Sequence, residues 1–135
     1  MKSIVFLYLN DVLRIYEKTT GLSYKNGLIN LGLLESAIAQ PKATMFGEYI
    51  YSDIFEMAAA YFFHIIKNHA FVDGNKRTGL VVAITFLEIN GISIHYDLEN
   101  LYTLSLGVAD SSLNKEDAAR FFRTGKLKTC IHEIN

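Results

Sequence analysis

The sequence predicts an all-α, single-domain protein of about six helices, and two observations lead to this prediction. Residues 52–69 and 77–91 form two long apolar segments, each bounded by residues typical of helix ends. A helix that is apolar on every side must be covered by its neighbours, so we expect these two segments at the centre of the fold. The length of 135 residues is that of one domain, which is expected to span residues 1–135.

Composition and charge narrow the possible environments and partners. The net charge of −1 gives no electrostatic sign of direct nucleic-acid binding, and no apolar run reaches the roughly 18 residues of a membrane span. The single cysteine, Cys130, cannot form an internal disulfide, and the apolar segment 3–9 lacks a cleavage site for a signal peptidase. We therefore expect a cytoplasmic protein that binds neither nucleic acid nor a membrane.

The N-terminal third is expected to hold two peripheral helices. The first is predicted to begin at Asn10 as N-cap and to stop at Gly21. A loop with a turn at Asn26-Gly27 follows, and residues 33–40 form a short helix ended by Pro41.

The central part begins with a different pattern. Residues 42–52 place β-branched and aromatic side chains around a glycine without helical spacing, which is typical of an extended flap or short hairpin, and an ordinary loop is an equal alternative. Ser52 is the expected N-cap of the first central helix, in which His64 is interpreted as a satisfied core histidine. Lys67 suits the negative end of that helix dipole.

The second central helix is expected to stop at Asn90-Gly91, and two further helices follow it. Asp97 is the predicted cap of the first. The second begins near Ser112 or Asn114 and stops at Gly125.

The segment between the central helices, residues 68–77 (NHAFVDGNKR), is the candidate functional site. The second helix starts near Gly74 or Asn75, and its free N–H groups and dipole form a site for an anion such as phosphate. Lys76 and Arg77 oppose the dipole in this first turn, a placement that is unfavourable unless an anion is bound. Asn75 can donate to the same anion or cap the turn.

Two residues beside the phosphate site add the chemistry. Asp73 is a hard oxygen ligand of the kind that Mg²⁺ takes together with phosphate oxygens. His69 is the natural general base for a hydroxyl nucleophile, and Phe71 is expected to point into the core. Each residue alone is more often structural, but their combination within nine positions favours function.

The stretch HAFVDGNKRTG resembles the motif of the Fic/Doc family, His-x-Phe-x-Asp/Glu-Gly-Asn-Gly-Arg-x-x-Arg. It departs at Lys76, which replaces the last glycine, and at Leu80, which replaces the second arginine. Both departures are features of the death-on-curing (Doc) branch, and the resemblance extends over residues 4–95. The matching residues are His69, Phe71, Asp73, Gly74, Asn75 and Arg77.

The resemblance implies a compact Fic/Doc (Fido) helical domain that modifies a protein hydroxyl with ATP or another nucleoside triphosphate. It implies His69 as the base, Asp73 as the Mg²⁺ ligand and a flap around residues 43–50 that aligns the target by strand addition. It assigns the phosphate grip to Gly74, Asn75, Lys76 and Arg77.

The sequence is compatible with three functions. Doc toxins are similar in site, transfer the γ-phosphate to elongation factor Tu and stop translation, whereas the usual Fic enzymes transfer AMP. The two departures from the motif favour the kinase, and a catalytically silent binding module is the third possibility. No built-in inhibitory helix is convincing, so we expect a separate antitoxin with a segment that folds on binding.

Overall fold

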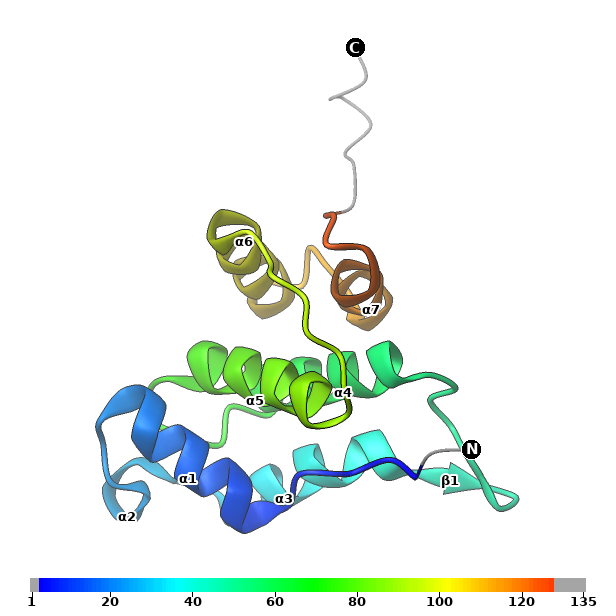
Figure 1. Cartoon of the computed structure of the whole chain (residues 1–135). Helices are drawn as coiled ribbons and strands as arrows, with labels where there is room; N and C mark the ends of the chain where they lie inside the picture. Colours follow the sequence, from blue (N-terminus) through cyan, green and yellow to red (C-terminus); the bar gives the residue numbers. More distant parts are fainter. Residues whose placement is uncertain (1–2, 128–135) are drawn as a thin grey trace.

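The computed structural model describes residues 3–127, so Cys130 lies outside the described residues. This part of the chain forms seven α-helices, a 3₁₀ helix and one hairpin, which confirms the mostly helical prediction (Figure 1). No helix in it is long and apolar enough to cross a membrane. The elements are α1 (Leu9–Thr20), α2 (Tyr24–Gly27), α3 (Leu31–Ala39), η1 (Gln40–Lys42), β1 (Thr44–Met45), β2 (Glu48–Tyr49), α4 (Ile54–Asn68), α5 (Asn75–Ile89), α6 (Leu98–Ala109) and α7 (Lys115–Thr124).

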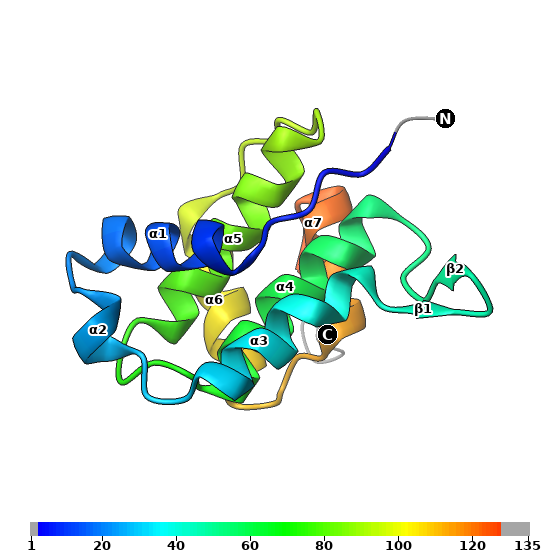
Figure 2. The same cartoon turned by 90° about the horizontal axis from the view of Figure 1, so that it is seen from below.

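Helices α4 and α5 form the centre of the fold, as their apolar sequences predict. The two helices pack against each other, α3 and α7 also contact α4, and α1 contacts α5 (Figures 1 and 2). Aromatic side chains fill the contacts: Phe62 meets Phe122 edge-on at 5.6 Å between ring centroids, and Tyr61 lies 5.0 Å from Phe86. Burial of a Phe-sized side chain stabilises a fold by about 1.5–3 kcal/mol, so these rings hold the layers together.

Two helix starts differ from the prediction by one or two residues. The N-cap of α1 is Tyr8 instead of Asn10, because the Asp11 carboxylate accepts a hydrogen bond from the Tyr8 N–H at 2.8 Å. The N-cap of α4 is Asp53 instead of Ser52, since Asp53 Oδ1 accepts from the backbone N–H of Glu56 at 2.8 Å. In both helices a carboxylate near the first turn fixes the boundary.

The loop predicted around Asn26-Gly27 contains the short helix α2. Glu17 of α1 accepts a hydrogen bond from the Tyr24 N–H at 3.0 Å and so satisfies one of the free donors at the start of this turn. Gly27 lies directly against Tyr16: a Cβ at this position would be 1.8 Å from the Tyr16 hydroxyl. The single helical turn is therefore fixed by contacts with α1 that sequence periodicity does not reveal.

The later boundaries agree with the sequence. Asn90 ends α5 and Asp97 precedes α6, while Asn114, not Ser112, caps α7 through a hydrogen bond from the Asp117 N–H at 2.8 Å. Gly125 ends α7 in the left-handed conformation with φ 76°.

The predicted hairpin is present, at one end of α4. Strands β1 and β2 pair antiparallel through a turn at Phe46 (φ 53°) and Gly47 (φ 81°), a conformation that suits tight hairpins. The hairpin precedes the N-terminus of α4, whereas His69 follows its C-terminus (Figures 1 and 2). Since α4 has 15 residues, the two features are separated by about 20 Å along the helix.

Candidate functional site

The motif loop, residues 69–74, connects the two central helices and begins with a strained residue. His69 ends α4 in the left-handed conformation (φ 51°, ψ 49°), which costs a non-glycine residue about 1 kcal/mol or more. Its side chain is exposed. The imidazole at the end of α4 therefore faces solvent and does not pack into the core.

The segment after α2 holds the motif loop from the other side. The Val72 N–H donates to the carbonyl of Gly27 at 2.8 Å, and the Ile29 N–H donates to the carbonyl of Ala70 at 2.8 Å. Phe71 is fully buried and stacks on Tyr16, with 4.0 Å between ring centroids. The inward orientation expected for Phe71 is confirmed, and the loop is fixed by both backbone and side-chain contacts.

Asn75 holds the motif loop with its side chain. Its Oδ1 accepts from the Phe71 N–H at 3.1 Å, and its Nδ2 donates to the Phe71 carbonyl at 2.8 Å. The residue is 5% exposed. Because the side-chain amide of Asn75 is bonded to Phe71, the group of Asn75 that can bind an anion is its backbone N–H.

Gly74 is the N-cap of α5, and two features of its surroundings require glycine. Its φ of 81° is left-handed, and a Cβ would lie 2.6 Å from Cγ2 of Thr20. The Gly74 N–H donates to Oδ1 of Asp73 at 2.8 Å. This bond holds the exposed Asp73 carboxylate beside the helix start.

Four residues of the motif loop and three of the first turn of α5 line one cleft of about 400 Å³, here called the motif cleft. Among residues 3–127, it is lined by three cationic residues, Lys67, Lys76 and Arg77, and by one carboxylate residue, Asp73. The N-terminus of α5 adds its dipole, so the cleft is suited to an anion. The lining residues are Ile66, Lys67, His69, Val72, Asp73, Gly74, Asn75, Lys76, Arg77 and Ala109.

The structure therefore brings all six site residues predicted from the sequence to one cleft, together with four others, of which Lys67 is the charged one. Lys67 was assigned only to the dipole of α4, and Ala109 lies at the end of α6, far along the chain. Lys67 could have been found from its position two residues before His69. No sequence signal pointed to Ala109.

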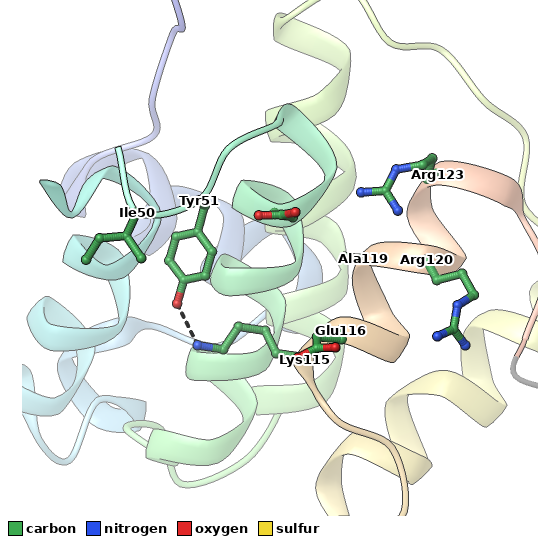
Figure 3. Close-up of a pocket in the computed structure, with 8 residues that line it drawn as sticks. Ile50, Tyr51, Lys115, Glu116, Ala119, Arg120 and Arg123 are labelled. Carbon is green, nitrogen blue, oxygen red and sulfur yellow. Dashed lines mark hydrogen bonds between the residues drawn. The ribbon is translucent and has the colours of Figure 1, made fainter. Parts of the chain in front are cut away.

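A larger cavity of about 540 Å³ lies between the hairpin end, α4 and α7 (Figure 3). Its two arginines are already paired with carboxylates, Arg123 with Asp53 at 2.8 Å and Arg120 with Asp117 at 3.6 Å, and Lys115 donates to the Tyr51 hydroxyl at 2.6 Å. None of the predicted site residues lines it. The smaller motif cleft, which holds all the predicted site residues, is therefore the better candidate for the functional site.

His64 differs from its prediction as a satisfied core histidine. Its Nε2 atom is buried and has no hydrogen-bond partner among residues 3–127. Burial, and secondarily the charge of Lys115, lower the pKa of His64 to about 4. The ring is therefore neutral at pH 7 and is not a satisfied polar group.

Comparison with known proteins agrees with this geometry. The profile of the Fic/DOC family matches residues 6–87. A protein named Toxin Doc from Mycolicibacterium smegmatis is 46% identical over 68 residues, which are 50% of this chain and 52% of the relative. Protein kinase doc from Escherichia phage P1 is 33% identical over 97 residues, 72% of this chain and 75% of the relative.

Proposed function

Since the chain belongs to the Fic/DOC family, we propose that it is the toxin of a toxin–antitoxin pair and transfers the γ-phosphate of a nucleoside triphosphate to a protein hydroxyl. The observation that carries the proposal is the motif cleft, where three cations and a helix N-terminus lie beside the exposed His69. The names of the relatives, Toxin Doc and Protein kinase doc, support it.

In this proposal the cleft residues have separate roles. His69 accepts the proton of the attacking hydroxyl as the new O–P bond forms, and the nucleoside diphosphate leaves. Lys76, Arg77 and the backbone N–H of Asn75 hold the phosphates and neutralise charge in the transition state, and the Gly74 N–H joins them by exchanging Asp73 Oδ1 for a phosphate oxygen. Catalysis then depends on position: the phosphorus that lies opposite the imidazole decides which group is transferred.

The donor set of the motif cleft fits Mg²⁺ that is shared with phosphate. Asp73 offers one carboxylate, of which Oδ1 also accepts from the Gly74 N–H. No group of three or more His, Cys, Asp or Glu gathers within the described part of the chain, so the protein oxygen ligands are few, as Mg²⁺ at nucleotide sites tolerates. Asp73 would hold the ion, which would neutralise part of the negative charge of the phosphates.

Two positions favour phosphate transfer over AMP transfer. Lys76 adds a charge and fills space in the first turn of α5, and the partly buried Leu80, one turn later, offers no contact to a distal phosphate. Both changes alter where the triphosphate is held. AMP transfer to a hydroxyl is the alternative for the same cleft, and the name of the phage relative supports the kinase.

The proposed partners and compartment follow from the same assignment. The substrate is elongation factor Tu, whose modification would arrest translation. A cognate antitoxin with a segment that folds on binding restrains the toxin, and both act in the cytoplasm.

Intact-protein mass spectrometry of elongation factor Tu, after incubation with the protein, Mg²⁺ and ATP, tests the proposal. A gain of about 80 Da supports phosphate transfer, and a gain of about 329 Da supports AMP transfer instead. His69→Ala serves as the inactive control and is expected to keep the fold, since the imidazole is exposed. A gain that persists in this variant contradicts the role of His69. Loss of toxicity without loss of antitoxin binding in the variant rules out a silent binding module.

A further inference from the structure

Lys67 lines the motif cleft together with the first residues of α5. It occupies the last turn of α4, and its ammonium group donates to the Ser111 hydroxyl and to the Ala109 carbonyl at 3.4 Å. Ser111 belongs to the connection between α6 and α7, and Ala109 is the last residue of α6 and lines the cleft. Lys67 therefore joins this connection to the motif cleft.

The present hydrogen-bond partners of Lys67 leave its charge uncompensated. A hydroxyl and a carbonyl are neutral, and the ion pairs formed within residues 3–127 involve other residues. The Asp110 carboxylate is near enough to share in the local field, but it accepts from the Ser112 N–H at 2.9 Å. Hydrogen bonds from Ser112, and to a smaller degree the charge of Lys67, lower the pKa of Asp110.

An anion in the motif cleft would give Lys67 a stronger partner than its neutral acceptors. Charge-assisted hydrogen bonds are about twice as strong as neutral ones, and the long flexible stem of lysine lets the ammonium group change partner. The cleft also holds Lys76 and Arg77, so a third cation is unfavourable there unless a highly charged anion is bound.

We propose that Lys67 is a third phosphate-binding cation of the nucleotide site and exchanges Ser111 for a phosphate oxygen when the nucleotide binds. The inference rests on the proposed function, because it names a further residue for the same nucleotide. It assigns the C-terminal end of α6 to one wall of the site.

The test measures the affinity of the full chain for a non-hydrolysable ATP analogue with Mg²⁺, and for adenosine, by calorimetry. Lys67→Gln is expected to weaken binding of the analogue about tenfold and to leave adenosine binding unchanged, whereas Lys67→Arg stays within about threefold of the wild type. Lys42→Gln is the matched control: Lys42 is also a partly buried lysine at a helix end, but it lies near Tyr8, away from the cleft.

Ser111→Ala separates phosphate binding from a purely structural role. If Lys67 binds phosphate directly, loss of its hydroxyl partner leaves the affinity for the analogue within about twofold. If Lys67 only anchors the α6–α7 connection, Ser111→Ala weakens binding as much as Lys67→Gln, and the inference is overturned. Equal affinities of the wild type and Lys67→Gln overturn it as well. A wild-type chain that binds no nucleotide would instead contradict the proposed function.

Discussion

The ring of Tyr16 lies parallel to the ring of Phe71, with 5° between their planes and 4.0 Å between their centroids. Tyr16 belongs to α1 and Phe71 to the motif loop, and both side chains are fully buried. The Tyr16 hydroxyl has no hydrogen-bond partner in the described part of the chain. The stack therefore connects the N-terminal helix to the loop that carries His69, and it does so through the ring alone.

Tyr16→Leu is expected to lower the rate of phosphate transfer at a temperature where the variant is folded, because the motif loop loses its support. It should also lower the free energy of unfolding by roughly 2–3 kcal/mol. Tyr16→Phe keeps the ring and removes an unsatisfied hydroxyl, so its activity and stability should match or exceed those of the wild type. Phe122→Leu is the control, since it removes a buried ring on α7, away from the motif loop. A similar loss of rate in this control would contradict the prediction.

Gly74→Ala is expected to destabilise the chain by roughly 2–3 kcal/mol, measured by urea unfolding. The left-handed φ accounts for about 1 kcal/mol, and the close approach of Thr20 for the rest. Gly21→Ala isolates the first contribution, because Gly21 has a similar φ of 74° and nothing within 4 Å of its added Cβ. Equal losses in the two variants would show that Thr20 moves aside without cost.

Asn75→Ala and Arg77→Ala should separate stability from nucleotide binding. Asn75→Ala leaves the buried N–H and C=O of Phe71 without partners, which is expected to cost about 2–4 kcal/mol of unfolding free energy. Arg77→Ala removes a cation from the first turn of α5, so stability should be unchanged or slightly higher while nucleotide affinity falls. Calorimetry together with urea unfolding checks both. A variant of Asn75 that is stable but binds no nucleotide would contradict the assigned role.

The stability of the chain should fall as the pH is lowered through the range set by His64. Its pKa of about 4 in the folded chain lies below the ordinary value of 6.5, so between these values the unfolded chain binds a proton that the folded chain does not. We expect a loss of roughly 1–2 kcal/mol from pH 7 to pH 4, less than full linkage because the ring is only partly buried. His64→Leu should reduce this slope, whereas His95→Gln, at an exposed position, should retain it. Identical slopes in both variants would contradict the prediction.

The central helices, the hairpin and the six predicted cleft residues could be identified from the sequence, because their signals are local. Apolar runs predict buried helices, and the order of residues from His69 to Arg77 places the charged groups at one helix junction. Local signals also explain the small differences at two helix starts: Ser52 and Asp53 are both capping residues at the start of α4, and the Asp11 carboxylate accepts from the Tyr8 N–H at the start of α1.

Features that depend on distant contacts could not be predicted. Helix α2 is fixed by Glu17 and by the close approach of Tyr16 to Gly27. The sequence is compatible with two roles for Asn75, binding an anion or capping the turn. Its hydrogen bonds to the backbone of Phe71 form only in the folded loop. The contact of Lys67 with the end of α6, through the Ala109 carbonyl, joins residues that lie 42 positions apart in the sequence.

Because His69 has a left-handed backbone conformation, a substitution at this position can abolish activity without lowering the stability of the fold. Asn and Gly adopt that conformation more readily than most residues, so either one at position 69 should give a chain that folds at least as well as the wild type. If the protein is a toxin, cells that survive its expression can do so through a single substitution here that preserves the whole folded protein. Genetic selection for survivors would then enrich intact, antitoxin-binding proteins, and these would be suitable material for studying the complex without toxicity.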